Sequence, residues 1–215
     1  MIIDRVMTRN PVFIHPDMSV NEVRSLMDKE KIGHLPVLDK GNRLVGIVTR
    51  EDLIKAAPSA ATTLDMYEIS YLLSKMTAEN VMVKKVITVA ENEVVEEAAR
   101  VMADNGIGCL PVMRGDLLVG IITDTDLFHA LIDAFGARYR GVRITCLTRD
   151  APGQFAKIAS AIAEKGGNFV AFVSAEGDDL THRRATLKIT GIARPDAEAV
   201  IRNFPDVEIE DVRES

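Results

Sequence analysis

Two threonine–aspartate pairs are the residues of this sequence whose types and spacing are best suited to chemistry. Thr49 is followed by Asp52, and Thr123 is followed by Asp126, each directly after a short apolar run. A hydroxyl and a carboxylate three residues apart can form a capping box, in which each side chain accepts a hydrogen bond from the backbone at the other position. The same groups at a helix N-terminus can instead hold a phosphate and accept from the hydroxyls of a ribose. One copy taken alone leaves both interpretations open.

The other reactive side chains form no recognisable catalytic or metal-binding motif. The sequence contains no zinc-protease helix motif, nucleophile elbow, dinucleotide fingerprint or Walker loop. The two cysteines are interpreted as buried thiols. His34 lies beside Gly33, near a predicted ligand pocket, and we interpret it as a surface histidine, with a role in that pocket as the alternative. We therefore expect no catalysis, no catalytic cofactor and no metal site. The histidines and cysteines concerned are His15, His34, His129, His182, Cys109 and Cys146.

The two threonine–aspartate pairs belong to an internal repeat. Ile32-Gly33 recurs as Ile107-Gly108, 75 residues later, and both are followed by Leu-Pro-Val after one intervening residue. After a turn that is one residue longer in the first copy, the stretch 46–52 returns as 120–126 at a spacing of 74. The apolar periodicity predicts strand, helix, strand, tight turn, strand and helix in each copy.

The repeated landmarks I-G-x-L-P-V and G-I-x-T-x-x-D resemble those of the CBS domain. The resemblance covers about residues 1–135 and implies a tandem pair, the Bateman module, that senses adenine nucleotides. It also implies that each pocket combines the threonine–aspartate pair of one repeat with the first strand and the Ile-Gly step of the other. The implied sites are Asn10, His15, Ile32 and Gly33 with Thr123 and Asp126, and Lys85, Ala90, Ile107 and Gly108 with Thr49 and Asp52.

The two implied sites differ in charge. The residue after the threonine is Arg50 in one repeat and Asp124 in the other, and the residue that opens the facing strand is Lys85 in the first site and Asn10 in the second. The difference amounts to three charge units. Because charge pairs stabilise an anionic ligand, we predict that the site of Thr49 accepts more phosphate than the site of Thr123.

Residues 58–75 are predicted to link the repeats. The segment 58–63 has the composition of a linker, and Thr62 with Asp65 is predicted to open an amphipathic helix. Such a helix needs a partner surface, either the other repeat or a second copy of the chain. Its apolar positions are Ile69, Leu72, Leu73 and Met76.

The remainder of the chain predicts a different unit. Strand patterns at 143–147, 168–174 and 184–189 and a final one at 207–209 are separated by helical patterns that begin near Pro152 and near Ala197. The order βαββαβ is that of the ferredoxin-like split unit. Such a sheet has open edges, and open edges need cover. We therefore predict a homodimer.

The D-x-P-G motif at 150–153 and the G-G-N motif at 166–168 resemble the ACT domain, a small-ligand sensor that often binds amino acids. The ligand residues implied by this resemblance are Asp150, Pro152, Gly153 and Asn168. Alternatively, Asp150 and Pro152 serve as the N-cap and first-turn proline of a helix, and Asn168 begins a strand. Two CBS units followed by one ACT unit resemble the acetoin-utilisation accessory protein family, which is the only basis for a link to acetoin.

Charge and hydropathy exclude other classes of partner. The net charge of −6 argues against a nucleic-acid footprint, which requires a basic face. No uncharged stretch approaches the ~18 apolar residues of a membrane span. The first residues lack the charged start and apolar run of a signal peptide, and we expect a cytoplasmic protein without membrane or nucleic-acid partners.

The sequence thus predicts an α+β protein: a CBS repeat over 1–57, a linker with an amphipathic helix over 58–75, a CBS repeat over 76–135 and a ferredoxin-like ACT domain over 142–215. We predict a regulatory binding protein without chemistry of its own, which binds adenine nucleotides and transmits their occupancy to the C-terminal ACT domain or to a partner such as a regulated enzyme. One alternative is an assembly scaffold whose CBS pockets stay empty. Another is a regulatory subunit that responds mainly to an amino acid.

Overall fold

The computed structural model describes residues 1–56, 65, 67–68, 71 and 75–215. The chain divides into two compact units, Met1–Leu127 and Phe128–Ser215, and each is described here by itself. The predicted linker helix lies largely outside the described residues, including Thr62, Ile69, Leu72 and Leu73.

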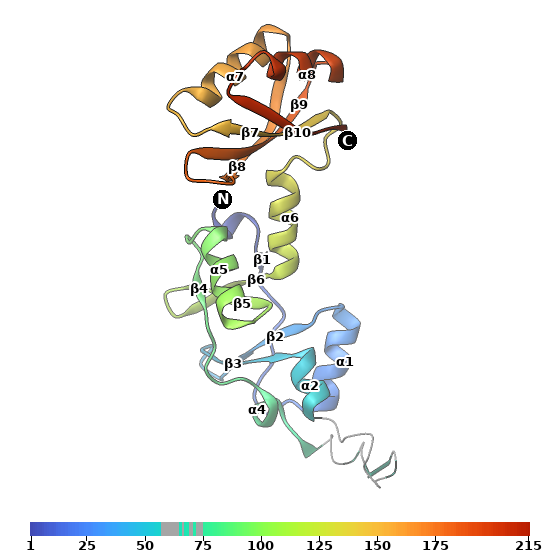
Figure 1. The fold of residues 1–215 in the computed structure, drawn as a ribbon. Helices are drawn as coiled ribbons and strands as arrows, with labels where there is room; N and C mark the ends of the chain where they lie inside the picture. Colours follow the sequence, from blue (N-terminus) through green and yellow to red (C-terminus); the bar gives the residue numbers. More distant parts are fainter. Residues whose placement is uncertain (57–64, 66, 69–70, 72–74) are drawn as a thin grey trace. The chain divides into compact units, whose positions relative to one another are not determined.

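The first repeat contains a helix packed on a two-stranded sheet (Figure 1). Its long helix begins with a capping box, in which Ser19 accepts from the backbone of Glu22 and the Glu22 carboxylate accepts from that of Ser19. Val20, Val23 and Met27 lie on one face of this helix and are fully buried. The elements are η1 (Ile3–Arg5), β1 (Thr8–Arg9), α1 (Val20–Glu30), β2 (His34–Leu38), β3 (Leu44–Thr49) and α2 (Arg50–Ala56).

The second repeat follows the same order of elements. Its long helix buries Val95, Ala98 and Met102 and ends at Gly106, whose φ of 63° is left-handed. Glycine adopts this conformation readily because it lacks a Cβ. The elements are α4 (Ala78–Val81), β4 (Val89–Ala90), α5 (Val95–Asn105), β5 (Cys109–Arg114), β6 (Leu117–Thr123) and α6 (Asp124–Ala134).

The two repeats exchange their first segments. β1 of the first repeat pairs antiparallel with β6 of the second, with Thr8 opposite Ile121, in a sheet of order β1-β6-β5-β4. In the opposite direction, Val83 forms a bridge to Ile47 on β3. This exchange brings the start of each repeat to the threonine–aspartate pair of the other.

Glycines make this close crossing possible. The side chain of Met7 packs directly on Gly120, and that of Met82 packs directly on Gly46. A Cβ at either glycine would overlap the sulfur of its methionine. Between the two repeats, Ile47, Cys109 and Ile121 form a small buried cluster. The repeats therefore share a packed centre within the first unit.

The second unit has the ferredoxin-like order that the sequence predicts. Its antiparallel sheet has the order β10-β7-β9-β8. The helices α7 and α8 lie together on one face, over a core that includes Ile144, Ile158, Leu187 and Ile201 (Figure 1). The elements are β7 (Val142–Arg149), α7 (Gln154–Glu164), β8 (Asn168–Glu176), β9 (His182–Thr190), α8 (Arg194–Arg202) and β10 (Val207–Glu214).

The other face of this sheet is polar. Arg184 on β9 forms an ion pair with Glu210 on β10 at 2.8 Å, and Arg143 on β7 forms one with Asp211 at 3.1 Å. This alternation of an apolar and a polar face is typical of antiparallel sheets. Within the described part of the chain, no helix combines the length and apolar character that crossing a bilayer requires.

Candidate functional site

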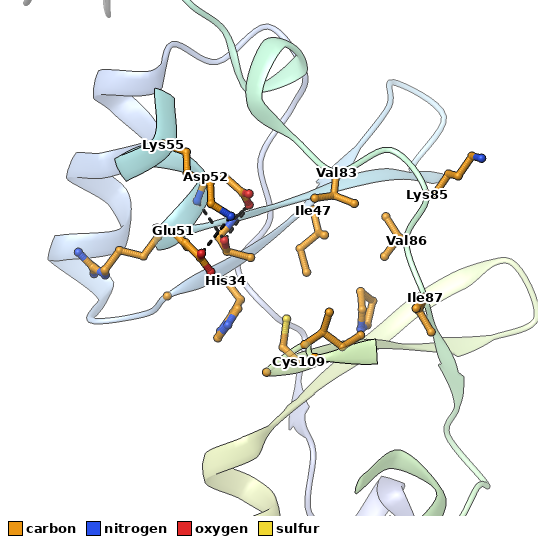
Figure 2. A pocket seen from close by; sticks show the side chains of 17 residues that line it. His34, Ile47, Glu51, Asp52, Lys55, Val83, Lys85, Val86, Ile87 and Cys109 are labelled. Atoms are coloured by element: carbon orange, nitrogen blue, oxygen red, sulfur yellow. Dashed lines mark hydrogen bonds and ion pairs between the residues drawn. The ribbon is translucent and has the colours of Figure 1, made fainter. Parts of the chain in front are cut away.

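Two pockets of the first unit are built around the two threonine–aspartate pairs. The Thr49 pocket has a volume of about 420 Å³ and the Thr123 pocket about 390 Å³, within the range of small-molecule sites. The Thr49 pocket is lined by Gly33, His34, Ile47, Thr49, Arg50, Glu51, Asp52, Lys55, Val83, Lys85, Val86, Ile87, Gly106, Ile107, Gly108, Cys109 and Pro111 (Figure 2). The Thr123 pocket is lined by Thr8, Asn10, Pro11, Val12, Lys31, Ile32, Gly33, His34, Ile121, Thr123, Asp124, Thr125 and Asp126.

The capping box is formed in both copies. Oδ2 of Asp52 accepts from the backbone N–H of Thr49 at 2.8 Å and from its hydroxyl at 2.7 Å. Oδ2 of Asp126 accepts the equivalent bonds from Thr123, both at 2.8 Å. Each threonine Oγ1 in turn accepts from the backbone N–H of its aspartate, at 3.3 and 3.4 Å.

The capping arrangement leaves part of each carboxylate unused. No described residue donates to Oδ1 of Asp52 or of Asp126, and both side chains are only partly buried. A carboxylate has lone pairs enough to accept further hydrogen bonds at its second oxygen. Capping and ligand binding are therefore compatible, whereas the sequence presents them as competing interpretations.

The pockets join residues from both repeats. Ile32 and Gly33 of the first repeat line the pocket of Thr123, and Ile107 and Gly108 of the second line the pocket of Thr49. Asn10 and Lys85 each lie in the pocket for which the sequence predicts them. The residues of the two predicted sites that line the pockets are Asn10, Ile32, Gly33, Thr123 and Asp126, and Lys85, Ile107, Gly108, Thr49, Asp52 and Arg50.

His15 and Ala90 are placed elsewhere. Leu38 is the last residue of β2, at the end opposite His34, and its carbonyl oxygen lies 2.8 Å from Nδ1 of His15. Ala90 pairs with Met113 near the far end of β5, whereas Cys109, at the start of β5, lines the Thr49 pocket. Neither His15 nor Ala90 lines either pocket.

The charged side chains of the Thr49 pocket are largely paired. Arg50 donates to Asp28 at 2.7 Å and to the carbonyl of Ile32 at 3.2 Å. Lys55 and Glu51 form an ion pair at 2.9 Å along α2. Figure 2 shows Lys85 projecting away from the rest of the lining.

His34 is a pocket residue, although the sequence favoured an ordinary surface histidine at this position. It begins β2, opposite Thr49, and lines both pockets. Burial lowers the pKa of its imidazole below the usual 6.5, although Asp124 and Asp52 oppose this shift. The position directly after Gly33 in a repeated motif is the signal that could have identified it.

The predicted ligand residues of the second unit do not meet within one chain. Asp150, Pro152 and Gly153 follow the end of β7, where Arg149 pairs with His182. Asn168 begins β8 and pairs with Thr190, at the other end of β9. Asp150 lines an open cavity with acidic neighbours rather than with Asn168. That cavity is lined by Asp150, Glu176, Gly177, Asp178, Asp179, Leu180, His182 and Arg183.

Comparison with known proteins identifies the family. The CBS domain model matches residues 3–59 and 78–133, which is more than half of the chain. The chain therefore belongs to the CBS-domain family and contains a tandem pair of these domains.

Solved structures support the same fold over the same region. A protein of Vibrio cholerae with a proposed role in acetoin utilization (AcuB) is 33% identical, with a TM-score of 0.53 over 64% of this chain and 95% of that one. The CBS domain pair of MJ0100, in complex with 5′-methylthioadenosine and S-adenosyl-L-methionine, is 28% identical, with a TM-score of 0.52 over 65% and 98%. CBSX2 in complex with AMP is 28% identical, with a TM-score of 0.50 over 61% and 96%.

A curated relative shows how little of a larger protein such a match can cover. The L-aspartate semialdehyde sulfurtransferase of Methanocaldococcus jannaschii is 30% identical over 127 residues. The match spans 59% of this chain and 22% of that relative. The activity of the relative is therefore not carried over to this chain.

Proposed function

We propose that this protein is a regulatory, non-catalytic binding protein that holds an adenosine-containing ligand in each of its two CBS pockets. The observation that carries this proposal is the joining, in each pocket, of a threonine–aspartate pair from one repeat with an Ile-Gly step from the other. The aspartate Oδ1 accepts from the ribose hydroxyls, and the threonine hydroxyl faces the 5′ substituent. The isoleucine packs on the adenine, and the glycine leaves room at its edge.

The ligands of similar structures support this class of ligand. The CBS pair of MJ0100 holds 5′-methylthioadenosine and S-adenosyl-L-methionine, and CBSX2 holds AMP. These compounds share adenosine and differ at the 5′ position. We infer that adenosine, AMP, ADP and ATP are the ligands to examine first in this protein, together with the two sulfur compounds.

We infer that ligand occupancy is transmitted through α6. This helix begins with Asp124 and Asp126 in the Thr123 pocket and continues to Ala134, so that it starts in the first compact unit and ends in the second. A ligand that further stabilises the first turn of a helix can affect the rest of it, because helix formation is cooperative. The second unit, or a partner enzyme bound to it, then responds to the nucleotide.

We further propose that residues 142–215 form an ACT domain that binds an amino acid between two copies of the chain. The ferredoxin-like order and the D-x-P-G motif support this proposal. Because Asp150 and Asn168 lie at opposite ends of the sheet, one ligand can touch both only if they come from different copies. The edge strands β8 and β10 offer unpaired backbone for such an assembly. Light scattering that gives a monomer mass at micromolar concentration, with and without amino acids, would overturn the homodimer.

We also propose the domain boundaries 1–57, 58–75, 76–135 and 142–215. A cytoplasmic location and a role in acetoin utilisation are proposals too.

The scaffold alternative is favoured by one observation. Both capping boxes are complete in the protein alone, and both threonine–aspartate pairs therefore already have a structural role. Only a binding experiment distinguishes a threonine–aspartate pair that caps its helix alone from one that also binds a ligand.

A thermal-shift panel tests the proposed function. Adenosine, AMP, ADP, ATP, 5′-methylthioadenosine, S-adenosyl-L-methionine and the amino acids are each added to the full chain. A ligand at 100 times its Kd stabilises by about 2.7 kcal/mol, which corresponds to about 5 to 10 °C in a chain of this size. A variant with both Asp52→Ala and Asp126→Ala should lose the response to the adenosine compounds and keep any response to amino acids. No shift with any adenosine compound would favour the scaffold.

A further inference from the structure

His34 occupies the wall between the two pockets. Of the described residues that line the pockets, only Gly33 and His34 line both. Figure 2 shows His34 reaching from β2 toward the strand that carries Cys109. A Cβ placed on Gly108 would lie 3.8 Å from His34 Nε2 and 3.3 Å from Asp124 Oδ2, so that the wall contains side chains of both repeats.

The imidazole is available to a ligand. The side chain is half-buried, and its ring makes no hydrogen bond to another described residue. A buried polar ring without a partner is costly, whereas a ring that borders two open pockets can reach water or a ligand from either. The contrast with His15 is informative, since Nδ1 of His15 lies 2.8 Å from a backbone oxygen.

Carboxylates at the starts of two helices line the same pockets as His34. Asp52 and Glu51 lie at the start of α2, and Asp124 and Asp126 lie at the start of α6. Asp124 and Asp52 both favour the charged imidazole, and burial disfavours it. The balance leaves His34 mainly neutral at neutral pH when the pockets are empty, because the net effect is a lowered pKa.

His34 is the only imidazole among the described residues that line the pockets. The cations in the two linings are Lys31, Arg50, Lys55 and Lys85. Burial raises the pKa of the Cys109 thiol to about 12, which keeps it protonated. Histidine is the side chain whose ordinary pKa lies near neutral pH, and His34 is therefore suited to change its charge when a ligand arrives.

We propose that His34 contacts the ligand in both pockets and couples their occupancy, an inference that rests on the nucleotide binding proposed above. A phosphate in either pocket favours the protonated imidazole, because an opposite charge nearby stabilises the charged form. The protonated ring then attracts an anionic ligand in the other pocket. Neutral adenosine lacks this charge and leaves the two pockets independent.

Proton uptake is the direct test. Calorimetry with AMP near pH 6.5, in two buffers of different ionisation enthalpy, should show uptake of a fraction of a proton per ligand. Adenosine should show none. His34→Gln should abolish the uptake, whereas His129→Gln, the same change at an exposed residue of α6 outside both linings, should retain it.

Coupling between the pockets is the second readout. We expect the ratio of the second to the first AMP affinity to change about fivefold between pH 6 and pH 8, the low end of typical coupling between sites. This change should be absent in His34→Gln and in His34→Lys, because neither replacement changes its charge between pH 6 and pH 8. If the parent protein binds AMP, but proton uptake and the ratio of the two AMP affinities are the same in His34→Gln as in the parent, this inference alone is overturned. No binding of AMP or adenosine by the parent would overturn the proposed function as well.

Discussion

The Thr49 pocket should bind ATP more tightly than the Thr123 pocket. The charges of Lys55 and Glu51 cancel in the Thr49 pocket, because the two side chains form an ion pair. The remaining charged side chains are Arg50, Lys85 and Asp52 in that pocket, and Lys31, Asp124 and Asp126 in the Thr123 pocket. The first set has one net positive charge and the second one net negative charge, so two units separate the pockets.

The structure makes this difference smaller than the three units that the sequence predicts. Asp28 offsets part of the Arg50 charge at 2.7 Å, and Lys85 projects outward (Figure 2). Exposed charge pairs are worth about 0.2 to 1 kcal/mol each. One to two effective units therefore give the Thr49 pocket an ATP affinity that is higher by a factor of up to about thirty.

Replacing Asp124 with Asn isolates one contribution to this gap. Oδ1 of Asp124 accepts from the backbone N–H of Thr125 at 2.7 Å, and an asparagine oxygen can keep this bond. Removing the negative charge should raise the ATP affinity of the Thr123 pocket by about 1.5-fold to fivefold, which is the contribution of one exposed charge pair. The affinity for adenosine should stay unchanged.

Calorimetry on two background variants measures the pockets separately. Asp52→Ala leaves the Thr123 pocket, and Asp126→Ala leaves the Thr49 pocket. The ATP gap should shrink in high salt, because ions screen partly exposed charges. Tighter ATP binding by the Thr123 pocket, or an equal gap for adenosine, would show that these charges do not govern the affinities.

Three further predictions concern stability and reactivity. Asp52→Ala and Asp126→Ala should each lower the free energy of unfolding by about 1 kcal/mol, the value of a lost cap, and each should also remove one nucleotide site. Denaturant titration measures the first effect and calorimetry the second. A loss of stability with both sites retained would support a cap without a binding role. Cys109 and Cys146 should resist alkylation at pH 8 until the protein unfolds, because burial raises the pKa of the thiols to about 12 and about 11, and rapid labelling of the folded chain would contradict this. Gly141→Ala should destabilise the second unit by about 1 to 3 kcal/mol, since a Cβ would overlap the carbonyl oxygen of Ile189; an unchanged melting temperature would show that the backbone yields there.

Local signals explain how much of the fold could be predicted from the sequence. The capping boxes at Thr49 and Thr123 depend on residues three apart, and they are formed as the spacing indicates. The order of elements in both units follows from apolar periodicity, which each short segment carries by itself. The pairing of β1 with β6 has no such local signal, and only the family resemblance indicated that the repeats exchange their first segments.

Long-range packing explains where the prediction of the site fell short. His15 and Ala90 were assigned by their place along the chain, but the direction of the adjoining strands takes them away from the pockets. The ion pair of Arg50 with Asp28 joins residues 22 apart, and it depends on how α1 packs beside α2. Neither outcome can be read from spacing, because each depends on the relative placement of whole elements.

The role proposed for His34 follows from a difference between the two repeats. The equivalent position in the second repeat is Cys109, which lines only the Thr49 pocket, whereas His34 lines both. Two copies of one motif thus place a titratable ring on one side of the shared wall and an uncharged thiol on the other. A duplicated fold can bind two similar ligands without this difference. The difference is what allows one pocket to respond to the charge of the ligand in the other.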